Sequence, residues 1–225
     1  MLFCFEDVKA FQTKFGVPMP SENQVLNDDA YNFRLGFLNE EKQEFIDSHV
    51  NKDFEGCIDA LLDEVYVACG TALMMGVTST QWLLVTNHVL SNDLATSTMP
   101  RGSVAKRGLH FLEDEEYNHA VGLLDLNLHS FVHFHFYGDV EKCTNALASI
   151  VLVCYDIANA MGIDMLTYTE MWDDVQRANM TKVRATDASQ SKRKSSLDVI
   201  KPAGWVGPNG GKILDKNYPG WREKL

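Results

Sequence analysis

The chain has 225 residues, of which 45% are hydrophobic and 23% are charged. This composition is that of an ordinary globular protein and excludes disordered, collagen-like and disulfide-scaffold classes. The 20 Lys and Arg residues against 31 Asp and Glu residues give a net charge of −11. Because this charge repels phosphate groups, we expect no nucleic-acid partner and no anionic-membrane partner.

The cysteines indicate a reducing compartment. There are five, an odd number; none belongs to a C-x-x-C pair, and most lie in apolar runs. We therefore predict buried free thiols. No apolar run reaches about 18 residues, and the N-terminus lacks the basic region of a secretory leader. The predicted location is cytoplasmic.

The spacing of apolar residues predicts helices along most of the chain, and hence an all-α fold. A short first helix ends at Gly16. The next two helices are expected over about 28–50 and 53–75, and they form a helical hairpin. A further short helix is expected over 78–93, and a loop rich in Gly and Pro over 95–108.

An internal repeat organises the rest of the sequence. Residues 37–77 align without a gap on residues 123–163, at a constant offset of 86. This predicts two related hairpins, 28–77 and 114–163, packed as a four-helix-type bundle within one domain, 1–225. Identical pairs include Phe45/Phe131, His49/His135, Asp53/Asp139, Glu55/Glu141, Cys57/Cys143, Ala60/Ala146, Leu61/Leu147, Met75/Met161 and Gly76/Gly162.

Acidic side chains gather on one face of each helix of the first hairpin. Glu40, Glu41 and Glu44 share a face of one helix, and Asp59 and Asp63 share a face of the next. If the hairpin is antiparallel, these carboxylates converge and repel one another unless a cation neutralises them. All-oxygen ligation favours Mg²⁺ or Mn²⁺. The alternative is a solvated acidic surface. The second copy has lost every one of these charges, so it is predicted to be degenerate; its matching residues are Leu126, Asn127, Ser130, Asn145 and Ser149.

These acids lie in the sequences EEKQE (40–44) and DALLDEVY (59–66), and MWDDVQRANMTK follows at 171–182. Together with FEDVKAFQTKFGVP at 5–18, they resemble the all-α nucleoside triphosphate pyrophosphohydrolases. This MazG-like group also holds phosphoribosyl-ATP pyrophosphohydrolase and dimeric dUTPase, and the resemblance is to its phage and bacterial branch. Two features depart from the family pattern: Ala60 stands where an acid is usual, and the NM motif follows the second hairpin instead of the first.

The resemblance implies an activity and roles for the acids. Family enzymes use divalent cations to convert a nucleoside triphosphate and water into a monophosphate and pyrophosphate, by attack of water on the α-phosphorus. By match, Glu41, Glu44, Asp59 and Asp63 are metal ligands, and Glu40 and Glu41 are catalytic. Asp59 and Glu40 serve either as ligands or as the group that orients and deprotonates water, and the general base stays open.

The resemblance also implies substrate contacts near the C-terminus. Asn179 and Lys182 match nucleotide-contacting positions, and Arg34 matches an arginine that often precedes the acidic motif. The segment 168–225 is therefore predicted to hold a nucleotide-contacting helix and a Pro- and Gly-rich tail. Residues 177–201 carry seven basic against two acidic side chains, a net of +5.

Parts of this C-terminal segment favour other roles. We interpret 189–196 as a solvated linker. The tail at 201–221 has no helical period, and docking of Trp205 and Trp221 on the bundle is preferred over a lid. The second hairpin is expected to shape the pocket for base and sugar.

Several alternatives remain at this stage. His129, His133 and His135 could bind zinc or nickel, but no fourth ligand is evident, and structural imidazoles are the default. The activity could be narrow, on dUTP or dCTP, or the protein could bind nucleotides for regulation without catalysis. A structural protein with only surface acids is the third alternative. Association into a homodimer of pseudo-dimers is left open.

Overall fold

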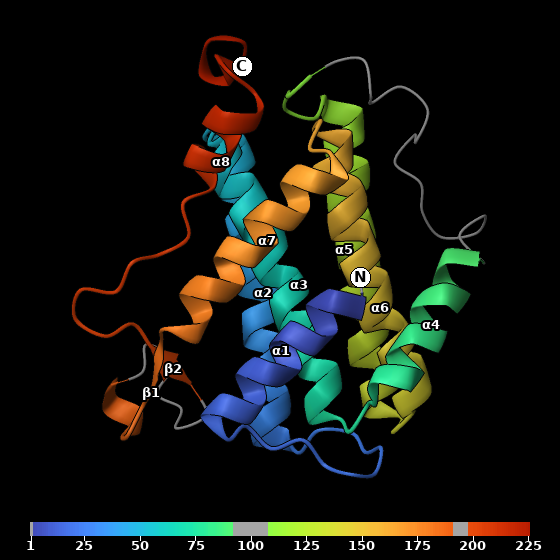
Figure 1. The fold of residues 1–225 in the computed structure, drawn as a ribbon. Coiled ribbons are helices and arrows are strands. Elements are labelled where there is room, and N and C mark those ends of the chain that lie inside the picture. Colours follow the sequence, from blue (N-terminus) through green and yellow to red (C-terminus); the bar gives the residue numbers. More distant parts are fainter. Residues whose placement is uncertain (1, 92–107, 191–197) are drawn as a thin grey trace.

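The computed structural model describes residues 2–91, 108–190 and 198–225, and it is an all-α bundle with one very small sheet (Figure 1). The expected loop at 95–108 and linker at 189–196 fall largely outside the described residues. The elements in chain order are α1 (Leu2–Phe15), α2 (Asp28–Val50), α3 (Phe54–Met74), α4 (Ser79–Ser91), α5 (Asp114–Phe136), α6 (Val140–Ala160), α7 (Met165–Met180), β1 (Val183–Arg184), a 3₁₀ turn (Ala188–Gln190), β2 (Val199–Ile200), α8 (Gly210–Asn217) and a second 3₁₀ turn (Trp221–Glu223).

The first hairpin has the predicted helices, and side-chain caps begin both of them. Asn27 accepts a hydrogen bond from the backbone N–H of Ala30 and begins α2. Asp53 accepts one from Gly56 and begins α3. The turn between the helices places Lys52 in the left-handed region, at φ 58°. These local bonds fix where each helix starts, and therefore which residues face one another across the hairpin.

The second hairpin repeats the first in register. The bounds of α5 and α6 equal those of α2 and α3 shifted by 86 residues, and Asp139 caps α6 as Asp53 caps α3. Gly76 and Gly162 end the two hairpins with φ of 81° and 95°. A Cβ on either glycine would lie 2.3 Å from a backbone carbonyl oxygen of the segment leading into the same hairpin. The predicted pair of related hairpins is therefore present in the fold.

The core lies between α3 and α6, which pack against each other at the centre of the bundle (Figure 1). Both helices are buried along most of their length. All five cysteines are free and buried, as predicted. Helix α6 is long and apolar enough to span a membrane by composition, but 78% of its most apolar window is buried inside the bundle, as in the core helix of a soluble protein.

The two hairpins exchange equivalent contacts. His49 of α2 stacks on Tyr117 of α5, with ring centroids 4.2 Å apart, and its Nε2 lies 3.2 Å from the carbonyl oxygen of Leu112. Conversely, the His135 ring stacks on Tyr31 with ring centroids 4.0 Å apart, and its Nε2 lies 3.0 Å from the carbonyl oxygen of Leu26. Because a carbonyl only accepts hydrogen bonds, each Nε2 carries the proton. The histidines therefore hold each hairpin to the segment that leads into the other.

The outer helices cover the two halves separately. Helix α1 packs on α3 and α4 packs on α6, and the stacked rings of Phe5 and Trp82 join α1 to α4. Helix α7 returns across α1, where the indole N–H of Trp172 donates to Asp7 and the Gln176 amide donates to the Asp7 carbonyl. The C-terminal part of the chain is thus brought beside the first hairpin.

The C-terminal region differs from the sequence prediction in two ways. Strands β1 and β2 form an antiparallel pair that we did not predict, because two-residue strands leave no periodic signal. The tail also contains a helix, α8, although no helical period was found there; an eight-residue helix capped by Asn209 is too short to show one. The preferred docking role is supported, because Trp221 is buried and the Trp205 indole N–H donates to the Ala178 carbonyl.

We predict that replacing His49 by Gln makes the fold less dependent on pH. Burial lowers the pKa of His49, so the unfolded chain binds a proton more readily than the folded chain. The stability supplied by neutral His49 is full above the unfolded pKa of about 6.5 and is lost as the pH falls below it.

Urea unfolding at pH 7.5 and pH 5.5 checks this prediction. We expect His49→Gln to cost about 1 kcal/mol at pH 7.5 and clearly less at pH 5.5. His119→Gln, at an exposed position of α5, is the matched control. A cost that is the same at both pH values would contradict the prediction.

Candidate active site

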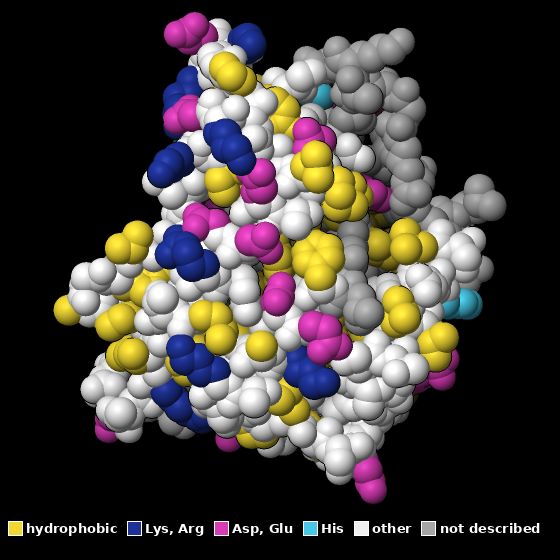
Figure 2. All heavy atoms as spheres, in the orientation of Figure 1, with side chains coloured by type: hydrophobic (Ala, Val, Ile, Leu, Met, Phe, Trp, Pro, Cys, Tyr) yellow, Lys and Arg dark blue, Asp and Glu magenta, His cyan; other side chains and the backbone are white. Residues whose placement is uncertain are grey.

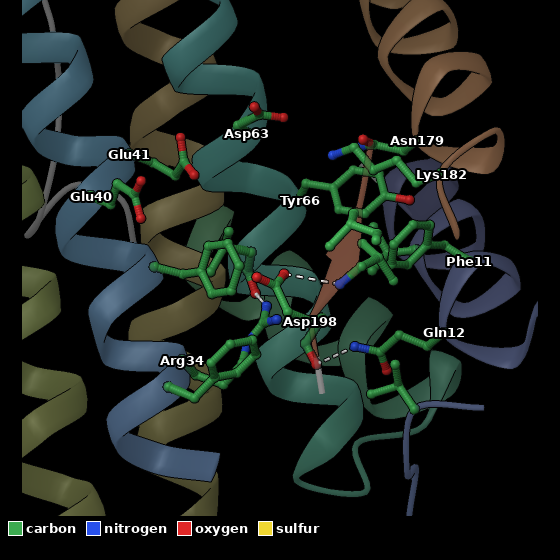
Figure 3. Close-up of a pocket in the computed structure, with 18 of the residues that line it drawn as sticks. Phe11, Gln12, Arg34, Glu40, Glu41, Asp63, Tyr66, Asn179, Lys182 and Asp198 are labelled. Atoms are coloured by element: carbon green, nitrogen blue, oxygen red, sulfur yellow. Dashed lines mark hydrogen bonds between the residues drawn. The ribbon is translucent and has the colours of Figure 1, made fainter. Parts of the chain in front are cut away.

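A cavity of about 510 Å³ lies between α1, α2 and α3 and is closed by the end of α7 and the segment around β2 (Figure 3). Its wall combines apolar, aromatic and charged groups. The polar and charged lining residues are Gln12, Arg34, Glu40, Glu41, Glu44, Asp63, Tyr66, Asn179, Lys182, Gln190, Asp198 and Lys201. Seven of the eight residues predicted for the site therefore line one cavity.

The acids reach the cavity because of their helical spacing. Glu40, Glu41 and Glu44 face it from α2, and Asp63 faces it from the antiparallel α3. Glu41 is the most enclosed of the three glutamates, with only 7% of its surface exposed, whereas Glu44 is exposed. The convergence of carboxylates between the two helices is thus present for four of the five predicted acids.

Asp59 is the exception. It lines a neighbouring cavity of about 210 Å³, together with Glu55 and residues near Pro208. Burial raises the pKa of Asp59 to about 7, and the charges of Asp63, Glu55 and Glu44 add to this effect. Asp59 therefore borders a different cavity, but the charges of the acidic cluster still raise its pKa.

Glu64 is an acid that the sequence analysis missed. It is only 3% exposed, and burial together with the charge of Glu41 raises its pKa well above the usual range. Its Oε2 has no hydrogen-bond partner among the described residues. The available signal was its place in the apolar stripe of α3, between Leu61 and Ala68, where a charged residue is unusual.

The opposite wall of the cavity carries cationic and amide groups from the C-terminal segment. Asn179 ends α7 and is buried, and Lys182 follows it. Burial lowers the pKa of Lys182, and the charge of Asp63 counteracts part of this effect. The ammonium groups of Lys182 and Lys201 lie 5.6 and 4.6 Å from the ring centroid of Trp205. The tail therefore helps to place both lysines beside the acids.

Arg34 lies at the cavity and also joins α2 to α3. Its Nε donates to the hydroxyl of Thr71 at 2.9 Å, and its Nη2 donates to the carbonyl oxygen of Val67 at 2.5 Å. These bonds hold the two acidic helices together below the carboxylates. Figure 3 shows Arg34 and Gln12 toward one end of the cavity and Glu40, Glu41 and Asp63 toward the other.

The carboxylates fit a hard divalent cation by their chemistry, because Glu41, Glu44 and Asp63 supply only oxygen donors to one cavity. As the side chains stand, no three acidic, histidine or cysteine groups of the described ranges are close enough to hold one ion. Binding therefore requires these carboxylates to rotate toward a common point.

The predicted role of the second hairpin in shaping the pocket is wrong. No described residue of α5 or α6 lines the cavity, which is instead walled by α1, α7 and the segment around β2. The uncharged counterparts of the acids bond within their own helices: Asn127 donates to Leu123, Ser130 to Leu126 and Ser149 to Asn145. The second hairpin contacts the first through the packing of α6 on α3, and its described residues do not reach the cavity.

The surface around the site carries charges of both signs. On the face shown in Figure 2, Lys and Arg side chains alternate with Asp and Glu side chains. This mixture matches the moderately negative sequence charge of −11. The cations at the cavity are thus a local feature and not part of a broad basic surface on this face.

Comparison with known proteins agrees with this site. The family model of phosphoribosyl-ATP pyrophosphohydrolase matches residues 8–84. This match confirms the resemblance over the segment that runs from within α1 to the beginning of α4. The matched family is one of pyrophosphohydrolases, which supports hydrolase activity in general. No curated protein and no solved structure gives a significant match.

We predict that Asp59→Asn stabilises the metal-free protein at high pH. Because its folded pKa is raised above the unfolded value of about 3.9, the folded state loses stability as the pH rises from about 3.9 to 7, and the full cost of ionised Asp59 is present above pH 7. In EDTA at pH 8.5 we expect the melting temperature of Asp59→Asn to exceed that of the natural protein by roughly 2–4 °C, the shift that about 1 kcal/mol produces at this size.

At pH 5.5, about halfway between the unfolded and folded pKa values of Asp59, the difference in melting temperature should fall to about half, and near pH 4 it should vanish. Asp47→Asn, an exposed change on α2, serves as the control for removal of one negative charge. If Asp59→Asn were equally stabilising at both pH values, the raised pKa of Asp59 would be refuted.

Proposed function

We propose that this protein is a divalent-metal-dependent nucleoside triphosphate pyrophosphohydrolase that converts a ribo- or deoxyribonucleoside triphosphate and water into the monophosphate and pyrophosphate. The family match to residues 8–84 supports the reaction class. The substrate, the metal and the mechanism go beyond that match and rest on the cavity.

The observation that carries the proposal is the composition of this one cavity. Carboxylates from α2 and α3 face Asn179 and Lys182, which lie more than 100 residues later in the chain. A purely solvated acidic surface does not bring a partly buried lysine and a buried amide opposite its carboxylates. A triphosphate, in contrast, needs cations and hydrogen-bond donors on one side and a neutralised acidic cluster on the other.

Each group has a definite task in this proposal. Lys182 supplies a point charge to the phosphates, and Asn179 supplies a hydrogen-bond donor and an acceptor. Mg²⁺ or Mn²⁺, when held by Glu41, Glu44 and Asp63, would neutralise the triphosphate charge and lower the pKa of a bound water. Glu40 or Glu41 orients the attacking water and accepts its proton.

The second hairpin acts as scaffold in this proposal. Its identical bounds and caps support a duplication in which one copy kept the acids and the other kept only the packing. The chain is then a covalent pseudo-dimer with one active half. Five buried free thiols fit a reducing compartment such as the cytoplasm.

The test is a panel assay of the purified protein with Mg²⁺ or Mn²⁺ and each common NTP, dNTP and dUTP, with phosphate and pyrophosphate resolved. Monophosphate plus pyrophosphate is the expected product pair. Release of diphosphate plus phosphate would contradict attack on the α-phosphorus. Metal-dependent nucleotide binding without any turnover would favour the regulatory alternative.

We predict that Glu41→Gln and Glu44→Gln each reduce kcat/KM at least about 100-fold, because each removes a charge that the transition state needs. The repeat supplies matched controls, Asn127→Ala and Ser130→Ala, at the equivalent positions of α5. Both controls should keep full activity. Equal losses at the two sets of positions would overturn the assignment of one active half.

A further inference from the structure

A buried amide at the inner end of the cavity is not explained by the metal or by the phosphates. Gln12 lines the cavity from α1 and is only 2% exposed. Its Oε1 is fully buried and has no hydrogen-bond partner among the described residues. A buried acceptor without a donor costs free energy, and such groups are rare in folded proteins. Because the Gln12 side chain forms part of the cavity wall, a molecule bound in the cavity is one source of the missing donor.

The orientation of this amide is fixed by its other end. The Nε2 of Gln12 donates to the carbonyl oxygen of Gly70 at 2.8 Å, and a flipped amide would place two oxygens together. Gly70 permits this approach because a Cβ there would lie 2.9 Å from the same Nε2 and 2.8 Å from Nη2 of Arg34. The Oε1 of Gln12 is therefore held as an acceptor.

The surroundings of Gln12 suit a flat aromatic ligand. Phe11 and Tyr66 meet edge to face, with ring centroids 5.3 Å apart, and Phe33 and Phe37 meet in the same way at 4.9 Å. All four line the cavity. In Figure 3, Tyr66 and Phe11 lie between Gln12 and Asp63. A ligand with charge at one end and an aromatic ring at the other fits this order of groups.

We propose that Gln12 binds the nucleobase: its Oε1 accepts a hydrogen bond from an N–H group on the hydrogen-bonding edge of the base, while the aromatic side chains contact the ring. This inference rests on the proposed function, because it assigns the base to the end of the cavity opposite the carboxylates. An acceptor fixed in this way favours bases with an amino or imide N–H and rejects analogues that lack it, since the acceptor would then stay unpaired.

The test combines a variant with a substrate analogue. The panel assay identifies the nucleotide that is turned over, and its analogue without the N–H donor is then compared with it. The analogue is the 2-pyrimidinone form for a cytosine nucleotide, the purine form without the amino group for an adenine nucleotide, and the N3-methyl form for a uracil nucleotide. The natural protein should lose at least about tenfold in kcat/KM with the analogue, whereas Gln12→Met should treat both substrates alike.

Two controls separate recognition from folding. Gln43→Met, at an exposed position of α2 outside the cavity, should discriminate as the natural protein does. Circular dichroism and the melting temperature show whether Gln12→Met is folded. If it is not, Gln12→Leu replaces it in the comparison of the two substrates. No discrimination by the natural protein would overturn the inference and indicate that buried water satisfies Gln12.

Binding distinguishes a failure of this inference from a failure of the proposed function. Calorimetric titration with nucleoside monophosphates and their donor-free analogues needs no turnover. Base-dependent binding that Gln12→Met removes would support the inference even for an inactive protein. Turnover with equal binding of both ligands would leave the hydrolase standing and overturn the role of Gln12. Absence of any nucleotide binding would overturn both.

Discussion

The packing of α3 on α6, fixed by the exchanged histidine contacts, is the constraint on which the rest of the molecule depends. His49 and His135 each bind the segment before the other hairpin, so neither hairpin can shift along the other without breaking a stacked pair and a hydrogen bond. Helix α6 of the second hairpin thereby covers one side of α3. The other side of the first hairpin is left to α1 and α7, and the cavity forms there.

The packing of the second hairpin on one side of α3 explains how the fold tolerates several acidic side chains close together on the other side. Glu41 and Asp63 face one another across a cavity, Asp59 has a raised pKa, and Glu64 is buried behind them. Such an arrangement costs stability in the absence of a cation, and the apolar interior between α3 and α6 offsets that cost. The second hairpin has uncharged residues at the equivalent positions and keeps the same helix bounds, as expected if only one of the two hairpins performs chemistry.

The sequence alone was sufficient wherever the information is local. Apolar spacing predicted the extent of α2, the acid spacing identified Glu41 and Asp63, and the family motif identified Lys182. It was insufficient where the site depends on tertiary contacts. Strand β2 is two residues long and reaches the cavity only by pairing with β1, which no periodicity reveals. Gln12 was not identified either, because only the approach of α3 buries this polar residue of α1.

The central claim is that the cavity of the first hairpin, and no other part of the bundle, binds a divalent cation together with a nucleotide. Crystals grown with Mn²⁺ and a nucleoside triphosphate analogue that carries a methylene bridge between its α- and β-phosphates test it directly, because anomalous scattering locates the metal. The account predicts Mn²⁺ beside Glu41, Glu44 and Asp63, phosphates toward Lys182 and the base toward Gln12. Metal on the second hairpin, or a nucleotide bound outside this cavity, would contradict it.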